Sequence, residues 1–161
     1  MPSSRTSAAE PLFLDTSALV RLYYLDPQDP FPWVVDLAAA PGTTLAASHL
    51  AYVETLAALH ALRRGRAITA RRQAQLSQAF KGSWPSFLRV PLSLPVVLLA
   101  GSLAEAHPLR GADALQLASF LWLLDREPGA RFLTLDRRLY EVARALVPVV
   151  PVPLWEQGGA P

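Results

Sequence analysis

The sequence predicts a single α/β domain in which a mostly parallel central sheet is flanked by helices on both sides. Short apolar runs alternate with longer helical segments along the chain, which is the pattern of an alternating β/α fold. Two of these runs, residues 12–14 and 132–135, end in an acid, Asp15 and Asp136, that is followed at once by a helix start. No internal repeat or linker interrupts this order, so one domain accounts for the chain.

The strands are expected where apolar runs are too short to form a helix. Residues 12–14 are expected to form the central strand, because they deliver an acid to the carboxyl edge of the sheet. Pro91 cannot donate a hydrogen bond to a neighbour, so the strand around it should lie at an edge, as should the Pro-containing segment near the C-terminus. The expected strands span residues 12–14, 43–47, 87–92, 131–135 and 147–152.

Capping residues and helix breakers define the expected helices. Ser48, Thr69 and Ser93 are good N-terminal caps, and Gly65 fits as a C-terminal stop. Pro95 lies in a first helical turn, where its missing N–H group costs least. The expected helices span residues 16–25, 32–40, 49–64, 70–81, 94–106, 112–126 and 137–146.

The composition is that of an apolar, charge-poor globular chain. With 52% hydrophobic and 17% charged residues, the chain does not resemble a disordered protein, and part of the apolar excess suits a partner surface. The absence of cysteine excludes disulfides, thiolate metal ligands and a cysteine nucleophile, and agrees with a reducing compartment. The basic residues are 14 Arg and one Lys, a balance that permits nucleic-acid binding and that a GC-rich genome also produces.

The two ends of the chain are expected to be flexible. We expect an N-terminal arm over residues 1–11, the folded domain over residues 12–155 and a short tail over residues 156–161. The arm lacks the apolar core of a signal peptide. The most apolar window, residues 94–101, is much shorter than the roughly 20 residues that cross a bilayer. We therefore expect a cytoplasmic protein.

Four acids have neighbours that should hold them near the apolar interior: Asp15, Glu54, Asp113 and Asp136. Asp15 and Asp136 precede helices and Asp113 lies in a first helical turn, so capping of backbone N–H groups is an alternative explanation for each. Glu54 lies in the middle of an apolar helix and has no such explanation. A buried carboxylate needs a cation, a hydrogen-bond donor or access to water, and the alternative for Glu54 is a simple exposed glutamate.

Four carboxylates that converge on one place would require cations between them. Oxygen ligands select hard divalent ions, Mg²⁺ or Mn²⁺, whose other positions are filled mostly by water. Such ions activate water and stabilise developing negative charge, so the expected reaction is hydrolysis of a phosphate ester by metal-activated water. The sequence has no Gly-rich phosphate loop, no His–Glu pair at metal-ligand spacing on a helix and no serine nucleophile elbow.

At these residues the chain resembles the PIN-domain ribonucleases, and in length and motif order it is similar to the VapC toxins of type II toxin–antitoxin systems. The resemblance covers about residues 12–150. Each motif alone is weak evidence for the family. Four motifs in this order, with Arg110 and Gly111 shortly before Asp113, are strong evidence for it. The matching segments are residues 13–19, Glu54 within its Ala-rich helix, residues 109–118 and residues 132–136.

The resemblance implies a PIN-like fold and an endoribonuclease that depends on Mg²⁺ or Mn²⁺. It also implies a homodimer, and a cognate antitoxin whose tail covers the site. The four acids would be the catalytic and metal-binding residues, with Asp15 the first choice as a direct ligand. The residues expected to support them by hydrogen bonds are Thr16, Ser17 and Thr134.

Two groups of arginines lie where RNA could meet them. Arg110, Arg137 and Arg138 flank the proposed acids, so they are candidates for phosphate contact. The other group surrounds a turn between two helices, where a solvated helix end is the simpler explanation. Its members are Arg63, Arg64, Arg66, Arg71 and Arg72.

The acids alone leave other functions open. A PIN nuclease of RNA processing, or a relative that acts on DNA, would carry the same acidic set. A catalytically silent PIN module that serves as an interaction protein is the alternative from a different class, and the complete acidic set counts against it. The length of the N-terminal arm and the Pro-rich C-terminal end depart from the family pattern, and they bear on partner contacts more than on catalysis.

Overall fold

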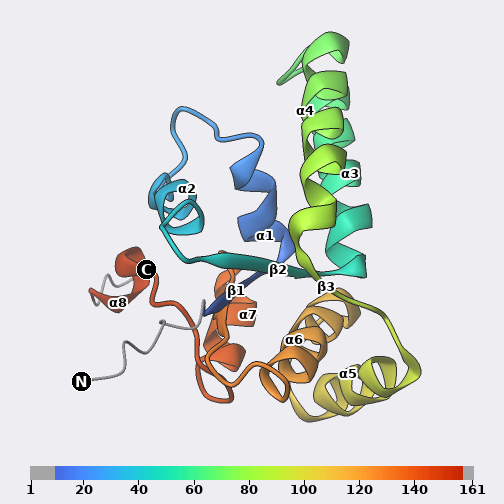
Figure 1. Cartoon of the computed structure of the whole chain (residues 1–161), viewed down its shortest axis with the longest axis vertical. Coiled ribbons are helices and arrows are strands. Elements are labelled where there is room, and N and C mark those ends of the chain that lie inside the picture. Colours follow the sequence, from blue (N-terminus) through green and yellow to red (C-terminus); the bar gives the residue numbers. More distant parts are fainter. Residues whose placement is uncertain (1–9, 158–161) are drawn as a thin grey trace, which may run out of the picture.

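The computed structural model describes residues 10–157, so most of the expected N-terminal arm and of the C-terminal tail lies outside the described residues. A four-stranded, fully parallel sheet forms the centre of the domain, with helices on both faces (Figure 1). The spatial order is β3-β2-β1-β4. The strands are β1 (Pro11–Leu14), β2 (Thr44–Ser48), β3 (Leu88–Val90) and β4 (Arg131–Leu133).

The first strand is central, as its apolar sequence predicts. β1 pairs with β2 on one side, where Phe13 lies opposite Ala46, and with β4 on the other, where Phe13 lies opposite Phe132. All four residues of β1 are buried. β3 lies at an edge, as expected from Pro91. From β1 the chain adds β2 and then β3 on one side of the sheet, and it then returns to add β4 on the other side of β1. The order of the strands therefore reverses between β1 and β4.

The helices agree with the sequence in number and order through residue 146, and differ mainly in their ends. The helix expected over residues 16–25 is shorter, because a 3₁₀ turn follows α1 at Val20–Leu22. The helix expected over residues 70–81 runs two residues further, through Gly82 to Ser83. The helices are α1 (Thr16–Leu19), α2 (Trp33–Ala38), α3 (His49–Arg64), α4 (Ala70–Ser83), α5 (Leu94–Ala106), α6 (Gly111–Leu124) and α7 (Arg137–Ala143).

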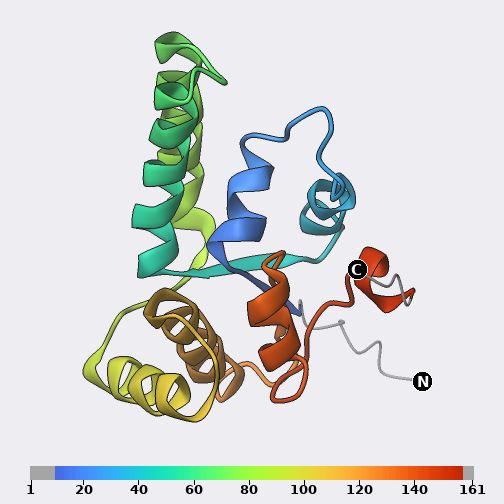
Figure 2. The ribbon, with the colours of Figure 1, turned by 180° about the vertical axis from the view of Figure 1, so that it is seen from behind.

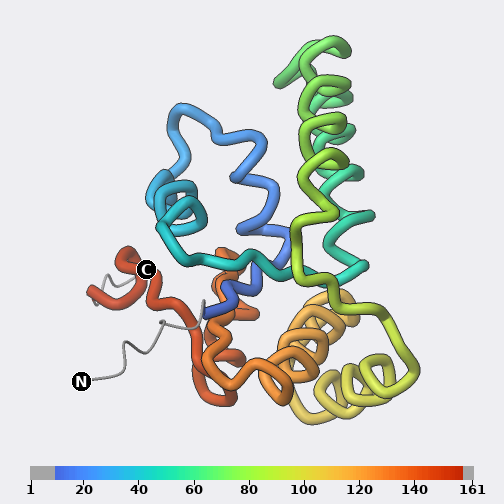
Figure 3. Tube along the Cα trace, viewed as in Figure 1, coloured from blue at the N-terminus to red at the C-terminus, as the bar shows by residue number. Residues whose placement is uncertain are grey.

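Alternate residues of β1 point into two separate cores. Phe13 packs against Phe120 of α6 and Phe132 of β4, with ring centroids 5.7 Å from each. Leu12 and Leu14 face the opposite core, which α1 and α2 cover. Figure 2 shows the same two layers from behind, and Figure 3 follows the chain from β3 into α5 and α6 on the Phe13 side. The central strand β1 is therefore buried on both faces, which accounts for its continuous apolar sequence.

The C-terminal segment forms less sheet than expected. Residues 147–152 make one isolated bridge, between Val149 and Phe132, and Val150 N–H donates to the Phe132 carbonyl at 2.8 Å. Prolines interrupt further pairing. A short helix that the sequence did not predict, α8 (Pro153–Glu156), follows it. Glu156, expected in the flexible tail, accepts a hydrogen bond from the Tyr140 hydroxyl at 2.5 Å.

None of the helices within residues 10–157 has both the length and the apolar character that a bilayer crossing requires. The apolar window of residues 94–101 lies in α5 and packs partly against the core, with Val96 and Ala100 buried.

Candidate active site

Asp15, Glu54, Asp113 and Asp136 line a single cavity of about 380 Å³ at the carboxyl ends of β1 and β4. Parallel sheets place ligand sites at such an edge, where neighbouring strands are followed by connections that leave in opposite directions. Asp15 follows β1 directly, and Asp136 lies three residues beyond β4. Glu54 comes from α3 and Asp113 from the first turn of α6. The fold thus brings together four acids that lie up to 121 residues apart in the sequence.

Asp15 is buried, with 4% of its surface exposed, and its carboxylate is held by three donors. Its Oδ1 accepts from the Ser17 hydroxyl at 2.5 Å and from Ala18 N–H at 3.0 Å. Its Oδ2 accepts from the Thr134 hydroxyl at 2.6 Å. The bond from Ala18 makes Asp15 the N-terminal cap of α1, so the capping explanation is confirmed for this residue. A carboxylate has about four lone-pair sites, so capping leaves room for a further ligand.

Ser17 and Thr134 also join the two strand ends to each other. The Ser17 hydroxyl accepts from Leu135 N–H at 2.8 Å, and the Thr134 hydroxyl accepts from Asp136 N–H at 3.1 Å. Each hydroxyl therefore donates to Asp15 and accepts from the β4–α7 connection. These contacts fix the orientation of the Asp15 carboxylate, which is the supporting position that the sequence suggested for both side chains.

Burial raises the pKa of Asp15 to about 6, from its ordinary value of 3.8. Loss of hydration is the largest cause, and the hydrogen bonds from Ser17, Thr134 and Ala18 oppose it by stabilising the charged form. The negative charge of Asp136 raises the pKa further. The ionised form of Asp15 is thus disfavoured within the protein, and a nearby cation would offset that cost.

Glu54 is half-buried and lies within a polar network that the sequence did not predict. Its Oε2 accepts hydrogen bonds from the Thr16 hydroxyl and from Gln116 Nε2, the latter at 3.2 Å. Gln116 also donates to Thr16 at 3.1 Å and accepts from the Ser48 hydroxyl at 2.9 Å. Gln116 is 3% exposed. It is the only side-chain amide among the mostly apolar residues 112–122, and this isolated polar position could have marked it as a site residue from the sequence.

Arg110 bridges the other two acids. Its Nε donates to Asp113 Oδ2 at 2.9 Å and its Nη2 donates to Asp136 Oδ2 at 3.0 Å. Asp113 is buried at 8% exposure, whereas the Arg110 side chain is exposed. These contacts raise the pKa of the Arg110 guanidinium above its ordinary value. The cavity therefore holds a fixed positive charge between two of its four carboxylates.

Arg137 and Arg138, the other candidates for phosphate contact, are exposed in the first turn of α7 and do not line the cavity. The helix that they open is capped by Asp136, whose Oδ1 accepts from Leu139 N–H at 3.1 Å. Asp136 thus combines capping with its contact to Arg110. Asp113 makes no capping bond of this kind, because its side chain turns toward Arg110.

The acids share one cavity, but the side chains as they stand do not form a ligand cage. Within residues 10–157 no group of three or more His, Asp or Glu side chains is arranged to hold a metal ion. Two of the carboxylates face Arg110, and Glu54 faces Thr16 and Gln116. A cation that bound Asp113 or Asp136 would compete with Arg110 for these carboxylates.

Comparison with known proteins agrees with this architecture. The chain is 42% identical over 98 residues to two proteins of Mycobacterium tuberculosis, Ribonuclease VapC45 and Ribonuclease VapC49, and the match covers 61% of this chain and 67% of each relative. A toxin–antitoxin complex from Klebsiella pneumoniae has a chain of the same fold, with a TM-score of 0.59 at 18% identity over 87% of this chain and 96% of that one. The model of the PIN domain family matches residues 12–145. This chain therefore belongs to the PIN domain family.

Proposed function

We propose that this protein is a VapC-type endoribonuclease that hydrolyses RNA phosphodiester bonds with a divalent metal at the acidic cavity. The observation that carries the proposal is the convergence of Asp15, Glu54, Asp113 and Asp136 on one cavity at the β1–β4 edge. Relatives at 42% identity that bear the name Ribonuclease VapC support the choice of RNA as substrate.

The donor set fits Mg²⁺ or Mn²⁺ in its chemistry. It offers carboxylate oxygens only, and it contains the buried Asp15, whose charged form is disfavoured by loss of hydration and would be stabilised by a bound cation. Asp15 would be the first ligand, with Asp113, Asp136 and Glu54 completing the set. A bound ion of this kind supplies an activated water and neutralises charge on the phosphate.

The surrounding side chains would position these groups. Ser17 and Thr134 hold the Asp15 carboxylate in one orientation, and Gln116 and Thr16 hold Glu54. If Asp113 and Asp136 turn toward a metal, they release the Arg110 guanidinium. Arg110 would then lie at the mouth of the cavity, where it could bind a phosphate of the RNA. Such support for ligands typically changes activity by roughly 10- to 100-fold.

A cognate antitoxin and a second copy of the chain are the partners that we propose, in a cytoplasmic setting. The structural neighbour described as a toxin–antitoxin complex supports the first. For the second, α5 exposes Leu94 and Leu98, at 69% and 63% of their surfaces, in a form that a partner would cover.

Metal removal tests the proposed function. With Mg²⁺ or Mn²⁺ present, the purified protein should cleave RNA, and EDTA should abolish cleavage because no other group in the cavity can activate water to the same degree. Return of the metal in excess over EDTA should restore the rate. The measurement is the rate at which labelled RNA fragments appear on a gel, and full activity in EDTA would contradict the proposal.

Replacement of Gln116 by leucine tests the support of Glu54. Gln116→Leu removes the two hydrogen bonds that its amide donates and leaves the buried Ser48 hydroxyl, which still accepts from Ala51 N–H, without an acceptor for its own proton. RNA cleavage should therefore slow by roughly 10- to 100-fold, and the free energy of unfolding should fall by about 1–3 kcal/mol. Gln73→Leu is the matched control, since Gln73 is also buried and donates to Ser77 on α4, away from the cavity. Equal activity of the two variants, measured at a temperature where both are folded, would argue against the role of Gln116.

A further inference from the structure

The charges of this chain are unevenly distributed. Residues 55–104 contain seven of the 15 basic residues and none of the 13 acidic ones, whereas the rest of the chain carries an excess of acid. A protein with a net charge of only +2 therefore has one strongly positive third. Such segregation concentrates a positive potential on one surface. The seven cations are Arg63, Arg64, Arg66, Arg71, Arg72, Lys81 and Arg89.

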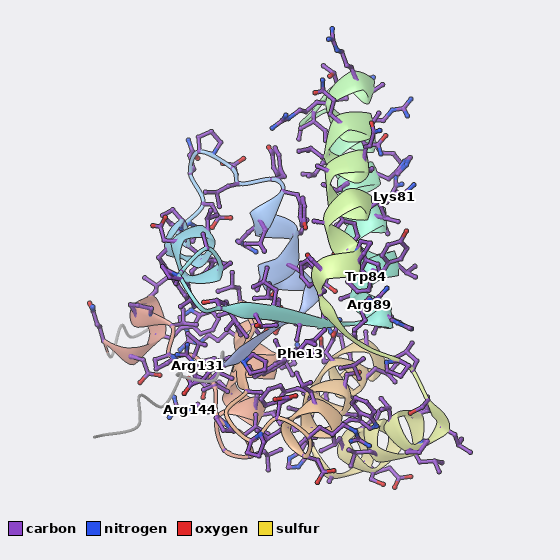
Figure 4. All side chains as sticks on the ribbon, viewed as in Figure 1. Phe13, Lys81, Trp84, Arg89, Arg131 and Arg144 are labelled. Carbon is purple, nitrogen blue, oxygen red and sulfur yellow. The ribbon has the colours of Figure 1, made fainter. Side chains whose placement is uncertain are left out.

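The fold places six of these cations on one projecting element. Residues 55–83, the last part of α3, the turn after it and α4, form a pair of helices that extends away from the sheet (Figure 1). We call these residues the basic hairpin. Its core is small, with Leu59, Leu76 and Phe80 among the buried side chains, and its six cations are all exposed. Figure 4 labels Lys81 on α4, and Arg89 lies below it at the base of the hairpin.

The cations of the basic hairpin differ from three exposed arginines on the body of the domain, although Arg89, Arg137 and Arg138 are exposed and likewise form no ion pair within residues 10–157. Arg126, Arg131 and Arg144 each lie within 4 Å of a carboxylate: Arg126 within 3.6 Å of Asp125, Arg131 within 3.9 Å of Glu10 and Arg144 within 3.7 Å of Glu141. None of the six hairpin cations forms an ion pair within residues 10–157. Their charge is thus not neutralised by the protein itself.

The tip of the basic hairpin contains a basic cavity. It has a volume of about 620 Å³ and is lined by Arg63, Arg66 and Arg72, by the hydroxyl-bearing Thr69, and otherwise by apolar residues. No carboxylate lines it. Three guanidinium groups around one hollow provide paired N–H donors in the geometry that phosphate oxygens accept.

Arg66 occupies a backbone position that favours glycine. The end of α3 is closed by hydrogen bonds from Arg66 N–H to the Arg63 carbonyl and from Ala67 N–H to the Leu62 carbonyl, at 3.0 and 2.9 Å. The residue that takes the left-handed conformation in this motif, with φ of 61°, is Arg66 rather than its neighbour Gly65. Arg66 is the only non-glycine residue with positive φ within residues 10–157. Glycine would adopt this backbone conformation at a lower cost in free energy than arginine. The presence of an arginine side chain here therefore indicates a role other than stabilising the fold.

We propose that the basic hairpin binds the phosphate backbone of the RNA substrate at a distance from the acidic cavity. This inference rests on the proposed function, and it identifies the part of the chain that holds the substrate. Glu54 of the cavity and Arg63 of the hairpin tip lie on the same helix, nine residues and so roughly 14 Å apart along its axis. Nine residues make roughly two and a half turns, so the two side chains leave opposite sides of α3, and a strand of RNA that contacts both places must pass around the hairpin.

Three substitutions at the tip test the hairpin. The variant Arg63→Gln/Arg66→Gly/Arg72→Gln removes the charges that line the cavity, and the matched control Arg126→Gln/Arg131→Gln/Arg144→Gln removes three exposed charges elsewhere; Figure 4 places Arg131 and Arg144 on the body of the domain. The probe is a fluorescein-labelled 20-mer of polyuridine in EDTA, with binding followed by fluorescence anisotropy at several salt concentrations.

The tip variant should bind this RNA at least about tenfold more weakly at low salt than the wild type. The slope of log K against log salt should fall by about two, because each phosphate contact on a single strand contributes roughly 0.7. The control variant should change the affinity less than threefold. Arg66→Gly alone should lower the slope by about 0.7 while its melting temperature stays equal to or above that of the wild type, which separates lost contacts from lost folding.

Three results would overturn the inference. These are wild-type affinity in the tip variant, an equal loss in the control variant, and equally tight binding of a polyglutamate peptide of the same charge, which would indicate an acidic protein partner. Failure here is distinguishable from failure of the proposed function. Metal-dependent cleavage with an unaffected tip variant would overturn only the hairpin, and RNA binding without cleavage in any metal would overturn only the nuclease.

Discussion

Asp15→Asn should slow RNA cleavage by more than roughly 100-fold while leaving the protein folded. The substitution keeps the size of the side chain, and Ser17 and Ala18 remain to donate to its amide oxygen, while the Thr134 hydroxyl meets the amide nitrogen in place of Oδ2; the negative charge that would hold a cation is removed. Substitutions in the shell around metal ligands already cost 10- to 100-fold, so loss of the ligand itself should cost more. The measurement is the single-turnover cleavage rate in saturating Mg²⁺.

Asp36→Asn is the matched control for this prediction. Asp36 is exposed on α2, outside the acidic cavity. This control should cleave RNA at the wild-type rate. A rate for Asp15→Asn within about twofold of the wild type would show that the Asp15 carboxylate does not take part in the reaction.

The second large effect is on stability, and it depends on pH. In EDTA, the free energy of unfolding of the wild type should fall by up to about 3 kcal/mol as pH rises from 4 to above 6, through the contribution of Asp15 alone. The native pKa of Asp15, about 6, lies above its ordinary value of 3.8, so the native state retains this proton while the unfolded state releases it. The stabilising contribution is therefore complete below pH 3.8 and is lost as pH rises through 6.

Comparison with Asp15→Asn isolates this contribution, because every other titrating group is common to both proteins. Urea denaturation at several pH values should show the difference in unfolding free energy changing mostly between pH 4 and 6. Added Mg²⁺ at pH 7.5 should restore stability to the wild type and not to the variant. A difference that stays constant with pH would mean that Asp15 is not the buried, destabilised carboxylate described above.

The sequence predicted the parts of this site that depend on strand ends. Asp15 follows a buried strand and Thr134 lies directly beyond another, and strands that are parallel neighbours bring such residues together. Helix ends with strong caps, such as Ser48 and Thr69, were also predicted correctly, since each side chain bonds a backbone N–H of the first turn. These features depend on local patterns that a single sequence contains.

Other features depend on tertiary contacts and were missed or incomplete. Gln116 reads as a polar residue on a helix, and its role follows only from where α6 packs beside Ser48 and Glu54. Arg110 was predicted as a phosphate contact, which stays a prediction, and the sequence did not show that Arg110 bridges Asp113 and Asp136, which are 23 residues apart. Arg110 and Asp113 are three residues apart, a spacing at which side chains of one helix can pair, so this contact could be predicted from the sequence. The contact between Arg110 and Asp136 could not, because it depends on how the chain folds.

The tip of the basic hairpin shows how a simple explanation changes once the fold is known. In the sequence, the arginines around residues 63–72 resemble a solvated helix end. In the structure three of them, Arg63, Arg66 and Arg72, line a cavity without acids, and Arg66 adopts a backbone conformation that favours glycine. The contrast with Arg131 and Arg144, which lie near carboxylates, appears only in three dimensions.

The most direct test of the central claim is a crystal structure of the protein with Mn²⁺, examined by anomalous diffraction. An anomalous peak is expected in the acidic cavity, within roughly 2.0–2.3 Å of an Asp15 carboxylate oxygen, with Asp113 or Asp136 turned away from Arg110 toward the same ion. The peak should be absent from Asp15→Asn crystals grown under the same conditions. Full Mn²⁺ occupancy elsewhere in the molecule, with Asp15 still bonded only to Ser17, Ala18 and Thr134, would contradict it.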